Sequence, residues 1–491
     1  MEESVRLKDI VAEIEEIKFE GDPDIEISGL AYDSRRVKSG DLFFCIRGFK
    51  TDGHEYAGRA QEAGASAVMV EEVMPDLSIT QVVVEDTRVG MARAASAFYG
   101  HPTRKMRLVG VTGTNGKTTT TYMIDSIFKS SGYKTGLIGT IEYRIGDEVF
   151  AVERTTPESL DIQRLFASMV DAGVEAVSIE VSSHAIDLAR VEACDFDALV
   201  FTNLSREHLD YHGTMEEYFK VKRRIFERTS GRDVVHVINV DDQFGRRIIE
   251  ETGSRHIRFS NKDKVEVYGT NIEARADGST FELHVPGAQT SVALRLPGMF
   301  NIHNALAAAG VAYSQGIGIN VIKVGLEALA AVPGRFERID CGQGFSVIVD
   351  YAHTPDSLEK ALIAAREITT GRLITVFGCG GDRDRGKRPL MGRIGTQLSD
   401  YAILTSDNPR SEEPGKIIEE IAEGARALNG NGYHIIEDRR LAIKEAIACA
   451  GNGDTVIIAG KGHEAGQEIK GEKMTFDDRD VARRCLEGLK G

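Results

Sequence analysis

The chain has 491 residues, 42% of them hydrophobic, and at about 100–200 residues per domain this length predicts about three domains. Lys and Arg number 60 against 76 Asp and Glu, and the net charge of −16 argues against a dedicated nucleic-acid-binding protein. Six widely spaced cysteines form no CxxC pair, which favours reduced thiols over a disulfide framework or a zinc site. The charged N-terminus lacks a signal-peptide core, and no apolar run approaches the roughly 18 residues of a membrane span. We therefore expect a cytoplasmic protein that is not an integral membrane protein and does not bind nucleic acid.

Residues 1–103 contain short and irregular elements. A strand is predicted for residues 41–46 (DLFFCI) and a helix near residues 55–63. The tract at residues 101–103, His-Pro-Thr, is typical of a linker. We expect a small N-terminal domain that ends there.

Residues 104–334 show a repeated pattern of strand, turn and helix. Buried strands are predicted at residues 107–112, 176–180, 198–202 and 234–239. Such alternation predicts a mainly parallel sheet covered by helices.

A second break, Ala-Val-Pro-Gly, falls at residues 331–334, and the alternation then resumes. Strands are predicted at residues 346–350, 373–377, 402–406 and 455–459. This pattern predicts a Rossmann-like unit over residues 335–491. The fold class is therefore α/β, with a small N-terminal domain (1–103), a central ATPase-like parallel-sheet domain (104–334) and a Rossmann-like C-terminal domain (335–491).

A glycine-rich loop, Gly113-Thr-Asn-Gly116-Lys117-Thr118, joins a predicted strand to a helix. In this setting backbone N–H groups face phosphates, the helix N-terminus adds positive potential, Lys117 neutralises oxygens and Thr118 is placed to ligate Mg²⁺. The usual GxxxxGK[ST] pattern has glycine where Val111 stands, so the loop is a variant. An ordinary glycine-rich turn is the weaker alternative.

Two further features suggest a metal site. Glu180 ends a predicted strand beside the glycine-rich loop, which favours a metal ligand over a solvated strand-end carboxylate. His208 and His212 are four residues apart, but zinc would require a third ligand that the sequence does not show. We favour a magnesium-site role for His208.

Residues 214–226 are predicted to form a helix opened by a capping box, Thr214 with Glu217. Lys222 falls in the middle of its apolar face. On the helix pattern alone, a lysine that extends its amine to water is favoured. A buried lysine with a lowered pKa would instead react with CO₂ and become a carbamate, which is an acidic metal ligand.

Several polar segments follow predicted strands or begin helices. The segment from Asn301 to Asn304 begins a helix of small residues, which fits packing against a nucleotide and a tight helix–helix contact equally well. In the C-terminal region, loops at residues 350–355, 378–384, 407–410 and 460–464 all follow strands. Four such loops at one sheet edge favour a binding site over simple turns.

Motifs typical of the Mur ligases occur in the chain in the family's order: TGTNGKTTT, EVSSHA, NLSREHLDYHGTMEEYFKVK, FNIHNALAA, VPGRFE, DYAHTPDSLE, GCGGDRDRGKRP, DNPRSEEP and IAGKGHE. The segment DSRRVKSGDLFFCIRGFKTDGHEYA resembles the family's UDP-binding domain, so the resemblance covers nearly the whole chain. It implies ATP-dependent ligation of meso-diaminopimelate to the D-Glu γ-carboxylate of UDP-MurNAc-L-Ala-D-Glu through an acyl phosphate. This reaction belongs to peptidoglycan precursor synthesis. The implied cofactors are Mg²⁺ and a CO₂-derived carbamate on Lys222, the partners are small-molecule substrates, and a monomer is expected.

The resemblance also implies roles for individual residues. Catalytic roles fall on Lys117, Glu180, His208 and Lys222, and the magnesium environment comprises Thr118, Glu180, His208 and Lys222. ATP is expected at Gly113, Thr114, Asn115, Gly116, Lys117, Thr118, Thr119, Asn301, Asn304, Arg335 and Asp350. The UDP-dipeptide is expected at Tyr32, Ser34, Phe49, Lys50, Thr51, Thr155, Thr156, Ser182 and Arg190. Diaminopimelate is expected at Arg383, Asp407, Asn408, Pro409, Arg410, Gly460 and Glu464.

Three alternatives are open. A sibling ligase would add L-lysine or another amino acid, and Arg410 argues against lysine because a guanidinium suits the distal carboxylate of diaminopimelate. A folylpolyglutamate synthetase is disfavoured by the UDP-type N-terminal region. A P-loop nucleotide-binding protein without ligase activity is the most distant alternative. Because ATP contacts are divided between two domains, we expect the junction at residues 333–334 to act as a hinge.

Overall fold

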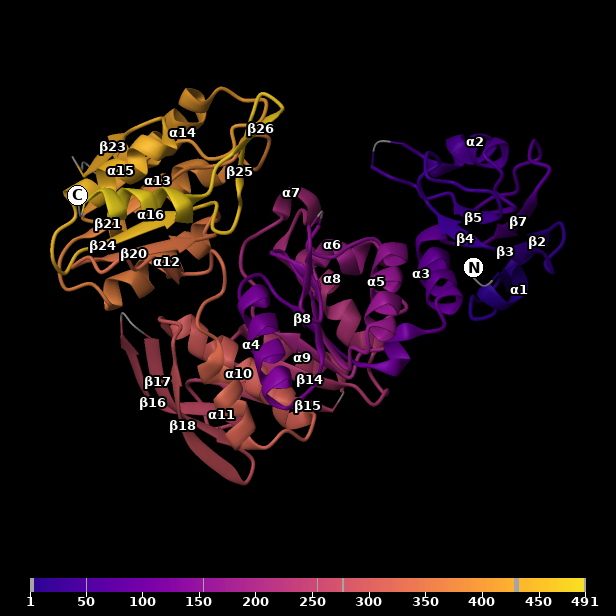
Figure 1. Ribbon diagram of the computed structural model, residues 1–491, viewed down its shortest axis with the longest axis horizontal. Coiled ribbons are helices and arrows are strands. Elements are labelled where there is room, and N and C mark those ends of the chain that lie inside the picture. The colour runs from indigo at the N-terminus through magenta and orange to yellow at the C-terminus, as the bar shows by residue number, and fades with distance from the viewer. Residues whose placement is uncertain are drawn as a thin grey trace.

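The computed structural model describes residues 4–49, 51–152, 154–253, 255–275, 278–427 and 432–489. Three units, each built on its own main sheet, follow one another along the chain and are seen as three lobes in Figure 1. The sheets carry helices in every unit, so the predicted α/β class is confirmed. None of the described helices is both long and apolar enough to cross a membrane.

The N-terminal unit is built on a five-stranded sheet with the order β2-β7-β6-β5-β4. Strands β4 to β7 are parallel and β2 pairs antiparallel with β7. The predicted strand at residues 41–46 is present, and it ends two residues earlier than expected. The elements are β1 (Val5–Arg6), α1 (Leu7–Ile10), β2 (Lys18–Glu20), β3 (Glu26–Ile27), β4 (Gly29–Ala31), β5 (Asp41–Phe44), η1 (Gly53–Tyr56), α2 (Ala57–Glu62), β6 (Ala67–Val70), β7 (Thr80–Val83), α3 (Thr87–Phe98) and η2 (Pro102–Lys105).

The central unit contains an eleven-stranded sheet with the order β11-β10-β9-β12-β8-β13-β14-β15-β16-β17-β18. Its strands are β8 (Arg107–Thr112), β9 (Thr135–Ile138), β10 (Tyr143–Ile145), β11 (Glu148–Phe150), β12 (Ala176–Glu180), β13 (Ala198–Phe201), β14 (Val235–Asn239), β15 (His256–Ser260), β16 (Val267–Arg275), β17 (Gly278–Val285) and β18 (Ala288–Leu294). Its helices are α4 (Lys117–Ser130), α5 (Ser159–Asp171), α6 (Ser183–Asp187), α7 (Leu209–His212), α8 (Met215–Arg228), α9 (Gln243–Thr252), α10 (Met299–Ser314) and α11 (Ile319–Ala328).

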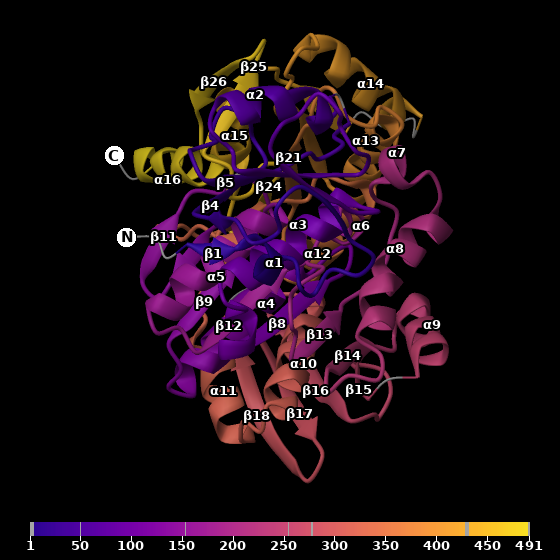
Figure 2. The same ribbon diagram turned by 90° about the vertical axis from the view of Figure 1, so that its right-hand side faces the viewer.

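The middle of this sheet is parallel, as predicted, from β9 to β16. The sequence did not indicate that both ends continue as antiparallel hairpins, β9–β10–β11 and β16–β17–β18. Strands β16–β18 lie at the opposite end of the molecule from α14 in both ribbon views (Figures 1 and 2).

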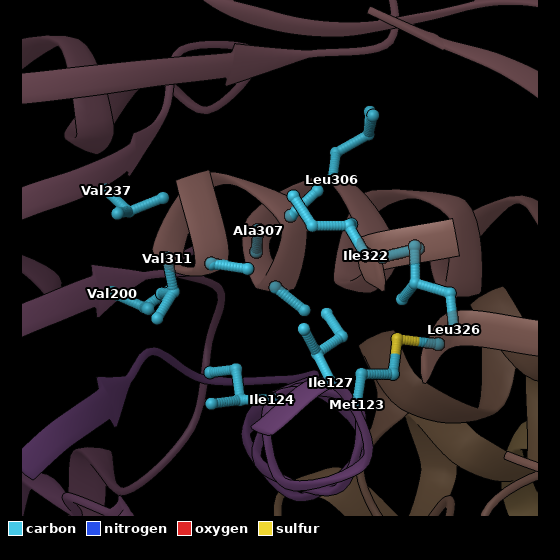
Figure 3. Packing of buried hydrophobic residues seen from close by; sticks show 14 of the residues in the cluster. Met123, Ile124, Ile127, Val200, Val237, Leu306, Ala307, Val311, Ile322 and Leu326 are labelled. Carbon is cyan, nitrogen blue, oxygen red and sulfur yellow. The ribbon is translucent and has the colours of Figure 1, made fainter. Parts of the chain in front are cut away.

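The main core of the central unit forms where α4, α10 and α11 pack against one face of the sheet. Ile124 and Ile127 of α4 meet Val311 and Leu326, from α10 and α11, in one apolar cluster (Figure 3). Alanines on α10 allow this close approach of the helices. The packing holds the N-terminus of α4 firmly against the end of β8.

The C-terminal unit has a six-stranded sheet with the order β19-β20-β24-β21-β22-β23, parallel except for β19. The predicted Rossmann-like alternation is present. The elements are β19 (Glu337–Arg338), β20 (Ser346–Asp350), α12 (Pro355–Glu367), β21 (Leu373–Phe377), α13 (Lys387–Leu398), β22 (Tyr401–Leu404), α14 (Pro414–Arg426), β23 (Tyr433–Ile435), α15 (Arg439–Cys449), β24 (Thr455–Ala459), β25 (Gly466–Ile469), β26 (Glu472–Thr475) and α16 (Asp478–Gly488).

Candidate active site

A cavity of about 410 Å³ lies between the central and C-terminal units. One wall is the glycine-rich loop from Thr114 to Thr119, and the opposite wall includes Arg335, Asp350 and His353. The two walls come from the carboxyl ends of β8 and β20, the sheet edge at which open α/β folds bind ligands.

The glycine-rich loop requires its glycines. Gly113 and Gly116 have φ angles of 146° and 87°, which residues with a Cβ rarely adopt. A Cβ on Gly116 would also lie 2.4 Å from Asn304 Oδ1. Lys117 Nζ donates to the carbonyl oxygens of Gly113 (3.0 Å) and Thr114 (2.7 Å), so its charge sits at the N-terminus of α4. The loop therefore has the geometry of a phosphate cradle.

A buried hydroxyl–carboxylate pair lies at the start of α4. Thr118 Oγ1 donates to Glu180 Oε2 at 3.0 Å, and Thr140 donates to both oxygens of Glu180, from N at 2.8 Å and from Oγ1 at 3.0 Å. Arg335 Nη2 donates to Thr118 Oγ1 at 3.0 Å from the other unit. Thr140 was not predicted from the sequence.

Oxygen ligands of this kind suit Mg²⁺, which usually takes one or two carboxylates and completes its shell with water and substrate phosphates. Among the described residues no three His, Cys, Asp or Glu side chains cluster as a metal site. With one carboxylate and one hydroxyl, the pair Thr118–Glu180 fits a magnesium ion whose other ligands would be nucleotide phosphates and water.

Lys222 lies on the buried face of α8 and is 1% exposed. Its Nζ donates to Gly113 O (2.9 Å) and Thr112 Oγ1 (3.3 Å), and it lies 4.9 Å from the centre of the Tyr218 ring. The reading in which the amine extends to water is therefore wrong. Burial, with the positive charge of Lys117, lowers the pKa of Lys222 well below its usual value. A neutral amine is the form that adds to CO₂, so the site fits a carbamate.

The two histidines of the predicted i, i+4 pair diverge. His208, with a left-handed φ of 54°, lines the cavity. His212 Nε2 lies 3.0 Å from Ser183 Oγ, and its ring stacks on Tyr218 at 4.9 Å. The pair does not converge on one point, so it gives no support to zinc.

Glu207 lines the same cavity and was missed by the sequence reasoning. Its Oε1 lies 3.8 Å from His353 Nε2 of the C-terminal unit. Burial alone would raise the pKa of Glu207, but the charges of His208, Lys117 and His353 outweigh burial and hold the pKa below its usual value. Its position next to His208 in the sequence is the feature that could have identified Glu207 as a site residue.

Asp356 connects the two units and was also missed. Its Oδ2 accepts hydrogen bonds from Asn115 Nδ2 and Ser205 Oγ, both at 2.7 Å, and from Lys360 Nζ at 2.9 Å. The sequence feature that could have indicated its role is an acidic residue in the first turn of α12, directly after His353-Thr-Pro. The C-terminal unit therefore contacts the glycine-rich loop directly.

Of the remaining residues expected at ATP, Asn301 and Asn304 are buried and Asp350 is half-buried. Asn304 Oδ1 accepts from Thr120 Oγ1 at 3.3 Å, and Asn301 Nδ2 donates to Pro297 O at 2.8 Å. The carboxylate of Asp350 accepts the backbone N–H groups of Phe336 (2.7 Å) and Ala352 (2.9 Å). Burial, the largest influence, raises the pKa of Asp350.

Most residues expected at the muramoyl-dipeptide are brought together near Glu180. Thr156 Oγ1 donates to Glu180 O at 2.8 Å and lies 3.3 Å from Ser182 Oγ. Arg190 Nη1 donates to Thr156 O at 3.0 Å, and Thr155 Oγ1 lies 3.1 Å from Thr140 Oγ1.

The residues expected at uridine diphosphate come from the N-terminal unit and are less closely grouped. Tyr32 donates to Asp161 Oδ2 of the central unit at 2.6 Å. Phe49 is 75% exposed, and its ring lies 5.9 Å from that of Tyr211. Ser34 is half-buried and Thr51 is exposed. Lys50 lies outside the described residues.

Residues expected at diaminopimelate converge at the carboxyl ends of β22 and β24. Asn408 Nδ2 donates to Glu464 Oε2 at 2.8 Å, and buried Lys461 donates to both side chains at 3.0 Å. Burial would raise the pKa of Asp407, but Arg439 and Lys461 hold it below its usual value.

The two arginines expected at diaminopimelate, Arg410 and Arg383, lie on the loops that follow β22 and β21. Arg410 Nη1 donates to Gly381 O at 2.7 Å. Gly460 packs against Asp407, since a Cβ there would lie 2.6 Å from Asp407 Oδ2. Arg383 is exposed on the loop that contacts Arg410 and donates to Asp382 O at 3.0 Å. Arg383 is thus the least enclosed of the group.

Family models match all three units. Residues 26–99 match the model described as Mur ligase family, catalytic domain; residues 111–312 match the Mur ligase middle domain; and residues 334–462 match the Mur ligase glutamate ligase domain.

Curated relatives match along nearly their whole length. The protein from Clostridium tetani is 44% identical and covers 99% of this chain and 100% of its own. The protein from Geobacillus kaustophilus is 46% identical over 95% of this chain and 96% of its own. Both are named UDP-N-acetylmuramoyl-L-alanyl-D-glutamate–2,6-diaminopimelate ligase.

Solved structures are also similar to this chain. A structure of a protein with that name is 32% identical over 100% of both chains, with a TM-score of 0.72. MurF ligase from Thermotoga maritima in complex with ADP shares the fold, with a TM-score of 0.63 at 18% identity over 94% of this chain and 98% of its own. The chain belongs to the Mur ligase family.

Proposed function

We propose that this protein is an ATP-dependent ligase that joins meso-diaminopimelate to the γ-carboxylate of D-Glu in UDP-MurNAc-L-Ala-D-Glu, a step of peptidoglycan precursor synthesis. The observation that carries the proposal is the cavity between two units, with a phosphate loop on one wall and Arg335 and Asp350 on the other. Coupling ATP to amide formation requires that the reactants meet in a fixed geometry, sheltered from water. The shared name of the relatives supports these substrates.

The reaction has two steps, each governed by charge. The γ-carboxylate attacks the γ-phosphate of ATP, which gives an acyl phosphate and ADP. The amine then attacks the acyl carbon, and the tetrahedral intermediate releases phosphate and a proton. Carboxylate and phosphate are both anionic, so Lys117 and Arg335 screen them from opposite walls of the cavity. Positioning and electrostatic stabilisation supply most of the catalysis.

Two cofactors belong to the proposal. Thr118 and Glu180, with His208, hold Mg²⁺, which neutralises charge on phosphate oxygens. Lys222 adds CO₂ through its neutral amine, forming a carbamate with loss of a proton. The adjacent oxygen atoms of Thr118 and Glu180 support the magnesium site, and the burial of Lys222 supports the carbamate.

The amino-acid subsite lies at the carboxyl ends of β22 and β24. Arg410 binds the distal carboxylate of diaminopimelate bidentately, and Glu464 pairs with its distal ammonium. Asn408 and Lys461 hold Glu464 in place. L-Lysine lacks that carboxylate and would lose its two hydrogen bonds to Arg410, whose Nε already lies 3.6 Å from Glu468 Oε2, so the preference for diaminopimelate is on the order of 10⁴-fold. The subsite also includes Arg383, Asp407, Pro409 and Gly460.

The UDP-dipeptide extends from the N-terminal unit to Glu180. Tyr32, Ser34 and residues 49–51 bind the uridine diphosphate, and Thr155, Thr156, Ser182 and Arg190 bind the muramoyl-dipeptide. The proposed domains are residues 1–103, 104–334 and 335–491. The protein acts as a monomer in the cytoplasm.

Competition between meso-diaminopimelate and L-lysine tests the proposal. Wild-type protein should release ADP only when UDP-MurNAc-L-Ala-D-Glu and an amino acid are both present, and it should use diaminopimelate. Arg410→Ala should lose most of that preference. Equal use of both amino acids by the wild type, or an unchanged preference in Arg410→Ala, would contradict the assignment.

A further inference from the structure

Arg388 of α13 is a fully buried arginine that none of the roles above uses. Its guanidinium makes a two-pronged contact with Glu412, with Nη1–Oε2 at 3.0 Å and Nη2–Oε1 at 2.8 Å. Nη1 also donates to Glu420 Oε2 at 2.8 Å. A bidentate pair in a buried setting is directional, and removing one partner leaves a buried charge.

Glu412 links this pair to the loop beside Arg410. Its Oε1 accepts the backbone N–H of Asp382 at 2.7 Å, and Arg388 Nη2 donates to Gly380 O at 3.3 Å. The hydrogen bond from Arg388, with the backbone contact from Asp382, lowers the pKa of Glu412 to about 2. Glu412 is therefore ionised at physiological pH.

The same loop contributes to the orientation of Arg410, whose Nε also lies 3.6 Å from Glu468 Oε2. Gly381 O accepts from Arg410 Nη1 at 2.7 Å, and Asp382 accepts from Ser411 Oγ (2.7 Å) and Ser411 N (3.1 Å). Asp382 and Arg410 both have φ of 52°, a conformation that surrounding contacts must maintain in residues other than glycine. The two segments thus form a closed ring of hydrogen bonds, with the Arg388–Glu412 pair at its buried end.

We infer that Glu412, fixed by Arg388, is a positioning residue that aims the Arg410 guanidinium and so sets the choice between amino acids with and without a distal carboxylate. This inference rests on the function proposed above. A guanidinium binds a carboxylate through two parallel hydrogen bonds only in the correct orientation, and a misplacement of about 1 Å costs about 10²-fold in rate.

The test compares Glu412→Ala with Glu420→Ala. Both remove a carboxylate from Arg388, but only Glu412→Ala removes the acceptor of Asp382 N. For each variant, kcat/KM is measured with meso-diaminopimelate and with L-lysine, together with KM for ATP and the melting temperature.

Glu412→Ala should lose roughly 10–100-fold in kcat/KM for meso-diaminopimelate, with little change for L-lysine or in KM for ATP. Glu420→Ala should keep the wild-type preference. Glu412→Gln keeps an acceptor for Asp382 N and should recover part of the loss. If Glu412→Ala does not fold, Arg388→Lys keeps the charge without the planar fork and should show a smaller loss of preference.

Two results would overturn the inference while leaving the proposed function intact: a wild-type preference in Glu412→Ala and Arg388→Lys, or an equal loss for both amino acids, as a purely structural role would give. A wild type that does not discriminate, in contrast, would contradict the proposed function itself and remove the basis of the inference.

Discussion

Asp356 joins the C-terminal unit to the phosphate loop, and replacing it with alanine tests how much this contact contributes to ATP binding. The change removes two hydrogen bonds between units, from Asn115 and Ser205, both at 2.7 Å. Hydrogen bonds to a charged group contribute about 1.5–3 kcal/mol each. Because the Asp356 side chain is 26% exposed, the lower value applies, which gives a loss of about 3 kcal/mol.

A loss of about 3 kcal/mol corresponds to roughly 10²-fold in an equilibrium constant. The proposed ATP contacts are divided between the units, so KM for ATP in the ligation assay should rise by up to about that factor. Small-angle scattering should show a larger radius of gyration for Asp356→Ala than for the wild type.

The control is Glu359→Ala, which removes an exposed carboxylate from the same helix. It should leave both measurements unchanged. A wild-type KM for ATP and an unchanged radius of gyration in Asp356→Ala would refute the idea that this contact holds the two units around the nucleotide.

Three further predictions concern the phosphate loop and Lys222. Gly116→Ala should abolish ATP binding in calorimetry, because the new Cβ would lie 2.4 Å from Asn304 Oδ1 at a φ of 87°; normal affinity would contradict the assigned loop geometry. Lys222→Ala should nearly abolish ligation, and formate or acetate should partly restore it by occupying the vacated site; full activity without them would exclude the carbamate. Burial lowers the pKa of Lys222 from its usual 10.5, so the unfolded chain binds a proton that the folded chain does not, and stability rises as the pH approaches 10.5 from below. In bicarbonate-free buffer Lys222→Met should therefore unfold at higher denaturant concentration at neutral pH and show a flatter pH dependence; equal slopes would argue against a neutral buried amine.

Strand positions in the two larger units were predictable from the sequence. The apolar runs at residues 107–112, 176–180 and 373–377 coincide with β8, β12 and β21. Each run is buried on both faces and bounded by polar or glycine-containing turns, so both ends of the strand can be predicted from the sequence. The helix predicted to begin at Thr214 is present as α8, and Thr214 Oγ1 accepts from Glu217 N, but the Glu217 side chain pairs with Lys220 and does not complete the predicted capping box.

The antiparallel ends of the central sheet were not predicted. Strand β17 alternates between buried and half-buried residues, a pattern that indicates a strand with one covered face, whereas the predicted strands were continuous apolar runs. Such runs mark only strands with both faces covered.

Contacts between residues far apart in the sequence could not be predicted from local sequence patterns. Asn115 and Asp356 are 241 residues apart, and Arg388 reaches Glu412 and Glu420 from another helix. Nothing in the spacing of these residues indicates the pairing, because folding of the sheet and docking of the units create it. The family's motifs predicted many candidate site residues, but not the side chains that contact them.

The most direct test of the proposed reaction follows the oxygen atoms of the γ-carboxylate. UDP-MurNAc-L-Ala-D-Glu labelled with oxygen-18 at that carboxylate is incubated with ATP, Mg²⁺ and meso-diaminopimelate, and product and phosphate are analysed by mass spectrometry. An acyl phosphate transfers one carboxylate oxygen to phosphate when the amine displaces it. We predict that each phosphate released carries one labelled oxygen and that the nucleotide product gains one diaminopimelate. Unlabelled phosphate, or ADP formation without amide product, would contradict the proposal.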